Sequence, residues 1–106
     1  MARLSRALEA CQKHKAGIVY VIIERGALSG PCKIGFTYKL QQRLASLQTG
    51  NHRALEAFKH TRCDNPQRVE RIVHDALSGY RIVGEWFAVS AQDAIDAVRN
   101  AMVGFD

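Results

Sequence analysis

The chain has 106 residues, which fits one domain with a modest core and leaves no room for a second independent domain. Apolar residues make up 47% of the sequence and charged residues 24%, and no apolar run approaches the roughly 18 residues that a membrane span needs. Fifteen Lys and Arg against ten Asp and Glu give a formal charge of +5, which by itself is a weak indication of a polyanionic partner such as nucleic acid.

The first 15 residues, MARLSRALEACQKHK, predict an amphipathic helix because Leu4, Leu8 and Cys11 recur at helical spacing. The segment has no continuous apolar stretch and no cleavage-like site, so it does not resemble a signal peptide. We therefore expect a cytoplasmic protein. Its three cysteines, an odd number in a chain without an export signal, favour reduced thiols over disulfides.

Two antiparallel strands, a helix and a third strand are expected next. Apolar alternation from Ile18 to Ile23 is typical of a strand, and a second strand follows at 32–36. The loop between them is too long for a two-residue turn, but its glycines suit a wider hairpin. Leucines at helical spacing predict a helix over 38–48 with Gly50 as its C-terminal cap, and residues 55–60 predict the third strand.

The sequence DNP at 64–66 predicts the start of another helix. Asp64 or Asn65 can accept hydrogen bonds from free N–H groups, and Pro66 suits the first turn. Apolar residues at helical spacing then carry this helix to Gly79.

The sequence GEWFAV predicts a last short strand, and Ser90 with Asp93 resembles a capping box that opens a final helix. The order of the elements describes an α+β fold, in which a small, mostly antiparallel sheet of three to four strands is flanked by helices. We expect a single domain over 1–106, consisting of an N-terminal helix (1–15), a core (17–89) and a C-terminal helix (90–103).

Four motifs in order resemble those of a known superfamily. GIVYVI stands in the place of the first motif of the GIY-YIG endonuclease superfamily, and CKIG stands in the place of the second. The chain is most similar to a short phage and bacterial branch related to the meiotically up-regulated gene 113 family. The KIG-T, R-L-x-x-L-Q-T-G-N, E-x-x-x-H and G-E-W-F motifs of that branch have counterparts here in KIGFT, RLASLQTGN, ERIVH and GEWF. The match implies a GIY-YIG-like fold, and it is more specific for family membership than for activity.

The resemblance implies a metal-dependent DNA endonuclease that hydrolyses phosphodiester bonds with one divalent metal ion, Mg²⁺ or Mn²⁺. Tyr20 would help to activate water, Arg43 would hold the phosphate and Glu70 would hold the metal. Lys33 stands where the superfamily's best-known form has a second tyrosine, a departure that the resembled branch shares. The hairpin and the helix behind it would then bring Tyr20, Lys33 and Arg43 to one phosphate.

Tyr20 and Arg43 each also have a simpler interpretation. Alternation places Tyr20 on the strand face of Ile18 and Ile22, where a packed and hydrogen-bonded tyrosine is the alternative to a reacting one. A phenol ionises at about pH 10, so a role as base needs a lower pKa, which Lys33 and Arg43 could provide. A planar guanidinium suits a phosphate, and a solvated helix charge is the alternative for Arg43.

Glu70 and His74 lie four residues apart and therefore share one side of their expected helix. A carboxylate beside apolar residues suits a hard cation, because Mg²⁺ binds one or two carboxylates and completes its shell with water and phosphate. An ordinary helix pair is the alternative. His74 is included with the catalytic candidates, and we expect it to orient Glu70 or to hydrogen-bond in the core rather than to bind the metal.

DNA is the expected partner, and basic residues are expected to contact its phosphates without reading sequence. The nucleic-acid-binding candidates are Arg43, Lys39, Arg53, Arg71 and Arg81, with Lys59, Arg62 and Arg68 as further basic residues. Trp86 is also a candidate, because it can stack on a base, although core packing is the commoner role of such a residue. A homodimer or a recruiting protein would supply the target specificity that so small a domain lacks.

Two pairs of residues, Cys11-x-x-His14 and His60-x-x-Cys63, together have the ligand types of a structural zinc site. Chance is the simpler explanation, because the pairs lie far apart in the sequence and Cys11 falls on the apolar face of its helix.

Three function classes follow from these observations. The presence of Tyr20, Arg43 and Glu70 together favours the endonuclease. The missing second tyrosine favours a nucleic-acid-binding module of the same fold with little or no turnover. A protein-interaction or inhibitor domain, whose charge mainly serves solubility, is the third class.

Overall fold

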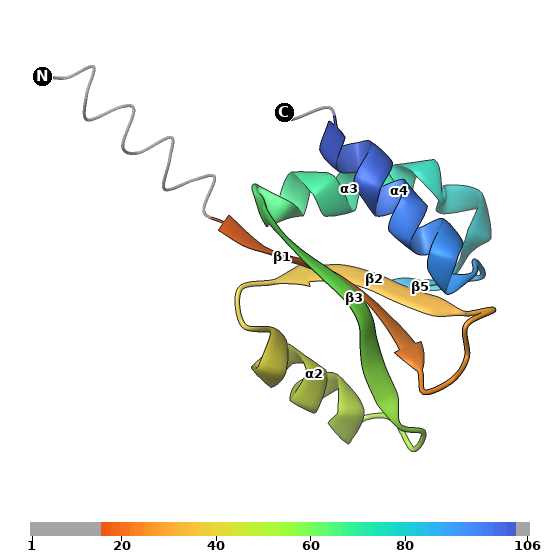
Figure 1. Cartoon of the computed structure of the whole chain (residues 1–106). Helices are drawn as coiled ribbons and strands as arrows, with labels where there is room; N and C mark the ends of the chain where they lie inside the picture. The colour runs from red at the N-terminus through yellow and green to blue at the C-terminus, as the bar shows by residue number, and fades with distance from the viewer. Residues whose placement is uncertain (1–15, 104–106) are drawn as a thin grey trace, which may run out of the picture.

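The computed structural model describes residues 16–103, which form a five-stranded antiparallel sheet with three α-helices (Figure 1). The strands are β1 (Ala16–Glu24), β2 (Cys32–Thr37), β3 (Leu55–Asp64), β4 (Arg81–Val83) and β5 (Trp86–Phe87), in the order β3-β1-β2-β5-β4. The helices are α2 (Leu40–Thr49), α3 (Pro66–Ala76) and α4 (Ala91–Val103), with a 3₁₀ turn over Ser78–Tyr80. α2 lies on one face of the sheet, and α3 and α4 cover the other (Figure 1).

β1 forms the middle of the sheet, because it pairs with β2 on one side and with β3 on the other. Its side chains alternate between two cores. Val19, Val21 and Ile23 belong to the larger core, with residues of α3 and α4. Tyr20 and Ile22 belong to the smaller core, against which the leucines of α2 pack. The predicted face of Tyr20 is therefore confirmed, and α2 is the helix that covers it.

The α+β prediction and the antiparallel hairpin are confirmed, but three elements differ in extent. The sheet has five strands rather than three to four, because Arg81–Val83 forms a short edge strand whose exposed side chains give no alternating pattern. The third strand continues past 60 to Asp64, because it pairs with β1 over its whole length. α3 ends at Ala76 rather than at Gly79, since the chain turns into the 3₁₀ segment there.

The start of α3 also differs from the prediction. Asn65 is the N-cap, but its φ of 55° is left-handed and no side chain caps the helix. The predicted cap by Asp64 or Asn65 is therefore wrong, whereas Pro66 does occupy the first turn, where its missing N–H needs no partner. At the start of α4, Ser90 Oγ accepts a hydrogen bond from the Asp93 N–H at 3.1 Å, which confirms the predicted cap.

Gly50 follows α2 as its C-cap, as predicted. The helix predicted within the first 15 residues lies outside the described residues. No helix within residues 16–103 has both the length and the apolar character needed to cross a membrane.

Candidate active site

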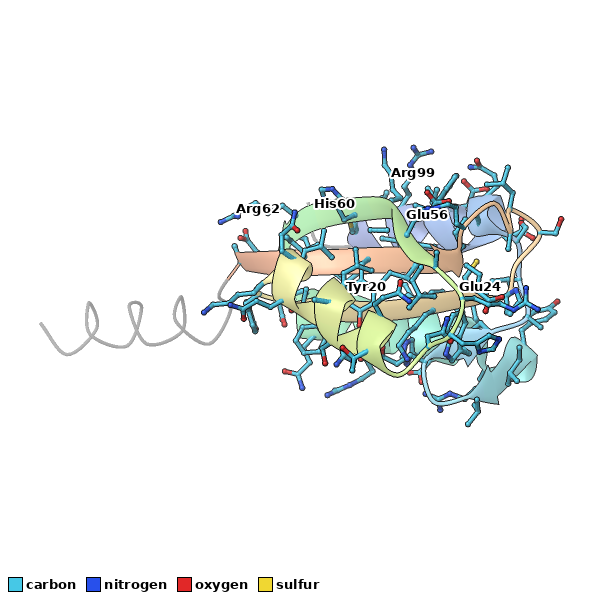
Figure 2. The ribbon with its side chains drawn as sticks, turned by 90° about the horizontal axis from the view of Figure 1, so that it is seen from below. Tyr20, Glu24, Glu56, His60, Arg62 and Arg99 are labelled. Atoms are coloured by element: carbon cyan, nitrogen blue, oxygen red, sulfur yellow. The ribbon has the colours of Figure 1, made fainter. Side chains whose placement is uncertain are left out.

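Tyr20 lies at the centre of a polar cluster between the sheet and α2. Its side chain is fully buried in the middle of β1, and Figure 2, which looks onto the α2 face, shows it behind that helix. The hydroxyl donates a hydrogen bond to Glu85 Oε1 at 3.1 Å and accepts one from Arg43 Nε at 3.2 Å. The phenol therefore links three distant parts of the chain, namely β1, α2 and the turn between β4 and β5.

Gly35 leaves the space that the Tyr20 hydroxyl occupies. The two residues lie directly opposite each other on β2 and β1. A Cβ added to Gly35 would collide with the Tyr20 hydroxyl and would lie 2.6 Å from Glu85 Oε1. The close approach of these two polar groups therefore explains the glycine of the KIG motif.

Two cations face the same carboxylate. Lys33 Nζ and Arg43 Nη2 each lie 3.8 Å from Glu85 Oε1. The side chains of Lys33 and Glu85 are 14% and 27% exposed, so solvent screens this pair less than it screens a pair on the open surface. The structure thus brings Tyr20, Lys33 and Arg43 around one point, at which Glu85 supplies a negative charge.

Burial raises the pKa of Tyr20 to about 12. Desolvation is the largest cause; the hydrogen bond from Arg43 lowers the pKa, and the charge of Glu85 raises it again. Arg43 therefore lowers this pKa as expected, whereas Lys33 faces Glu85. Burial outweighs the effect of Arg43, so the net shift is upward and not toward the lower pKa that a base needs. The neutral phenol is the form that donates to Glu85.

The short strand β5 explains how groups from the two faces of the sheet meet. β5 pairs with β2 only at the first two residues of β2, so the edge of β2 beyond them has no neighbouring strand. Other groups occupy that edge: the Ile34 N–H donates to the Glu85 carbonyl at 3.0 Å, and the Ile34 carbonyl lies 2.7 Å from His74 Nε2. A hydrogen bond from the Phe36 backbone stabilises the charged form of Glu70. Side chains of α3 therefore reach the Tyr20 cluster through this open edge.

Glu70 extends the cluster from α3. Its pKa is raised, first by burial and then by the negative charge of Glu85, while His74, the Phe36 backbone and Arg43 oppose the shift. Two carboxylates therefore lie close enough to repel each other. Among residues 16–103, no group of three or more His, Cys, Asp or Glu side chains could hold a metal ion, so an ion at Glu70 would complete its shell with water and phosphate.

His74 connects α3 to the sheet. Its Nε2 faces the Ile34 carbonyl, which can only accept, so Nε2 carries the proton. Nδ1 then accepts from Arg81 Nη2 at 3.4 Å, and the ring lies 4.9 Å from that of Phe87. Both ring nitrogens have protein partners in this arrangement, and neither is directed to a metal.

The basic residues expected to contact phosphate are spread over the molecule. Lys39 lines an open hollow together with Arg43. Arg53, which follows α2, forms an exposed ion pair with Glu24, and Arg71 is exposed on α3. Arg81 is engaged by a backbone carbonyl at 2.8 Å and by a histidine. Lys39 and Arg43 are thus the two basic candidates that line one hollow close to Tyr20.

The described part of the hypothetical zinc site cannot hold one ion. His60 and Cys63 lie three residues apart on β3, so their side chains point to opposite faces of the strand. Cys63 packs against the larger core, while His60 projects from β3 at the margin of the sheet (Figure 2). Cys63 and Cys32 are free thiols. Cys11 and His14 lie outside the described residues.

Glu85 and Gly35 are the members of the cluster that sequence reasoning missed. Both lie in motifs that carry the resemblance, GEWF and KIGFT, and those motifs are the signal that could have found them. Their contact with Tyr20 depends on the pairing of β2 with β1 and β5, which no local pattern reveals.

The T5orf172 domain family matches residues 17–102, and the chain belongs to this family, which is related to the GIY-YIG nucleases. No curated protein and no solved structure matches the chain. The matched span contains the whole Tyr20 cluster, from β1 to the turn before β5.

Proposed function

We propose that the protein is a metal-dependent endonuclease that hydrolyses DNA phosphodiester bonds, and that it belongs to the short branch with the KIG-T motif. The observation that carries this proposal is the cluster in which the buried Tyr20 phenol contacts Arg43 and Glu85. Lys33 adds a positive charge to this cluster, and Glu70 adds a negative one. Burying charged and polar groups costs free energy, so such a cluster is typical of a functional site.

Arg43 and Lys33 bind the scissile phosphate. In the protein alone both cations lie 3.8 Å from one carboxylate oxygen, which is longer than a hydrogen bond, so they retain donors for a ligand. The guanidinium offers N–H groups in a fixed fork, and the ammonium acts as a point charge. Lys33 then stabilises phosphate charge instead of reproducing the chemistry of a second tyrosine.

Tyr20 and Glu85 together take the proton of the attacking water. A pKa of about 12 keeps Tyr20 neutral at physiological pH, so it can accept a proton only by giving up its own. Its hydroxyl already donates to Glu85 Oε1. As an O–H bond of the water breaks, its proton passes to the phenolic oxygen and the phenolic proton passes to Glu85. The resulting hydroxide attacks phosphorus, and the bond from phosphorus to the leaving oxygen breaks.

Glu70 would hold the Mg²⁺ or Mn²⁺ ion, and the donor set fits such an ion. Glu70 offers a hard oxygen ligand, and a cation there would relieve its repulsion from the neighbouring Glu85. When bound, the ion supplies Lewis-acid stabilisation of the phosphate charge. His74 positions Glu70, because its hydrogen bond to Ile34 fixes α3 against β2.

The chain acts on DNA as a single domain, and a homodimer or a recruiting protein supplies its target specificity. Nucleic-acid binding without turnover is the second candidate function. The observation that favours it is the raised pKa of Tyr20, which makes the phenol a poor base unless Glu85 relays the proton.

Treatment of supercoiled plasmid DNA with the protein in Mg²⁺, Mn²⁺ or EDTA tests the proposal. The wild type should nick or linearise the plasmid only with a metal, and Glu70→Gln should abolish this while still binding DNA. Asp75→Asn is the matched control, because Asp75 is an exposed carboxylate on the same helix. A wild type that never cuts would favour the binding module, and full cleavage by Glu70→Gln would remove Glu70 from the site.

A further inference from the structure

Two open hollows lie along the same side of α2, and each contains one of the two cations that face Glu85. The first is lined by Thr37, Tyr38, Lys39, Gln42 and Arg43, and residues lining the second include Lys33, Ser46, Asn51 and Trp86. Arg43 and Ser46 lie in the helix, and the residues that cap it, at 39 and 50, continue the same helical spacing, so the hollows follow one face of α2. The first hollow lies near the beginning of the helix and contains Arg43, and the second lies near its end and contains Lys33.

The second hollow has the composition of a nucleobase site. Trp86 is half-buried, packs against the smaller core and lines the hollow. Lys33 Nζ lies 5.6 Å from the centroid of its ring. Ser46 contributes a hydroxyl, and Asn51 contributes an amide oxygen, since its Nδ2 donates to the Arg53 carbonyl at 2.7 Å. Both oxygens can hydrogen-bond the edge of a base. Val83, which pairs with Trp86 across β4 and β5, is 66% exposed and extends the apolar surface beside it.

We propose that this hollow binds an unpaired nucleobase next to the phosphate held by Lys33 and Arg43, so that the protein acts on single-stranded or locally unpaired DNA. The identity of the phosphate site rests on the proposed function. Lys33 determines how far the phosphate lies from the base, because its ammonium is 3.8 Å from Glu85 Oε1 and 5.6 Å from the centre of the Trp86 ring. A phosphate at Lys33 therefore has its own nucleoside within reach of Trp86.

A base inside an intact duplex cannot enter this hollow, because neighbouring base pairs cover its faces and its partner occupies its edge. Proteins that bind single strands combine a basic path along the backbone with aromatic rings on which bases stack. Here Lys39, Arg43 and Lys33 supply the basic path, and Trp86 supplies the ring. The charges select a phosphate backbone, and the ring selects a strand whose bases are exposed.

Trp86 is the single tryptophan of the protein, so tryptophan fluorescence reports on the hollow directly. The full chain is titrated in EDTA, which prevents cleavage, with a short oligothymidylate and with an abasic chain of equal phosphate number. The wild type should bind the oligothymidylate about 5- to 150-fold more tightly, the range expected for stacking of a base on an aromatic ring. Fluorescence quenching should accompany binding of the oligothymidylate but not of the abasic chain.

Trp86→Leu should bring the two affinities together by weakening the binding of oligothymidylate alone. Trp86→Phe should restore part of the difference, because phenylalanine still offers a ring for stacking. Phe58→Leu is the matched control, since Phe58 is an exposed aromatic residue on β3 that does not line either hollow. It should keep the wild-type ratio of affinities.

Equal affinities of the wild type for the two chains, or an equal loss for both in Trp86→Leu, would overturn the proposal. The comparison of the two DNA chains needs no variant, so it decides the question even if Trp86→Leu fails to fold. A protein that never cleaves DNA but shows the base-dependent difference would keep this site and lose the nuclease function. A protein that cleaves DNA but binds both chains equally would keep the nuclease function and lose this site.

Discussion

The Tyr20 hydroxyl lies 3.1 Å from Glu85 Oε1 and donates a hydrogen bond to it, although 65 positions separate the two residues. The contact joins the central strand to the turn before β5. It also pairs a phenol whose pKa is raised to about 12 with the carboxylate best placed to take its proton. In the proposed mechanism Tyr20 and Glu85 therefore act as one unit, in which neither residue is a sufficient base alone.

Tyr20→Phe should fold, because the ring keeps its buried packing and only the hydroxyl is lost. Turnover should fall by about 10²-fold or more, the range expected for a lost general base. Ultraviolet absorbance titration should show that the phenol missing from the variant is the one that ionises at about pH 12. Unchanged turnover would make Tyr20 a packing residue.

Gly35→Ala should destabilise the protein, because the added methyl group would collide with the Tyr20 hydroxyl and crowd Glu85. Overpacking of this kind costs about 1–3 kcal/mol, which lowers the Tm of a domain this size by at least about 4 °C. Gly79→Ala is the control, because nothing lies within 4 Å of a Cβ added there. Thermal unfolding of both variants measures the difference.

The same substitution should cost less in a Tyr20→Phe background, since the hydroxyl that the methyl group meets is then absent. A double-mutant cycle over Gly35 and Tyr20 measures this coupling. Equal costs in the two backgrounds would show that the glycine is required for another reason.

Local sequence patterns predict the elements on which the site is built. Alternation around Tyr20 and the helical spacing of leucines in α2 predict both sides of the smaller core, because each pattern depends only on its own element. The position of Glu85 could not be predicted in this way, because it depends on the pairing of β5 with distant β2. The sequence also predicts the cation beside Tyr20, which does lower its pKa, but it does not reveal the burial that raises the pKa by more.

Lys33→Met should slow cleavage without moving the alkaline limb of the pH–rate profile. Arg43 is the cation that hydrogen-bonds the phenol, whereas Lys33 Nζ faces Glu85 and the Trp86 ring. The lost cation should weaken phosphate binding, so KM should rise while the pKa of Tyr20 stays unchanged. An alkaline limb displaced to higher pH would show that Lys33 does lower that pKa.

Glu70→Gln should make the metal-free protein more stable at neutral pH. Burial and the charge of Glu85 disfavour the Glu70 carboxylate, and the amide removes that charge at nearly constant volume. The Tm of the variant should therefore lie above that of the wild type, by about 4–8 °C for each kcal/mol gained in a domain of this size. Thermal unfolding in EDTA measures the gain, with Asp75→Asn as the exposed control on the same helix.

The pH dependence of that gain follows from the direction of the pKa shift. Because the pKa of Glu70 is higher in the folded protein than in the unfolded chain, the unfolded chain ionises first as the pH rises. The wild type therefore loses stability relative to Glu70→Gln between the two pKa values, and the full penalty is present above the pKa of the folded protein.

On acidification Glu70 becomes protonated and the penalty disappears, so the unfolding temperatures of the wild type and of Glu70→Gln should converge at about pH 4 and separate toward neutral pH. Added Mg²⁺ should reverse the order of the two Tm values at neutral pH. An ion bound to the folded wild type stabilises it by mass action, whereas Glu70→Gln lacks the carboxylate that would bind the ion. A Tm difference that stays the same at every pH would mean that the charge of Glu70 carries no penalty in the folded protein.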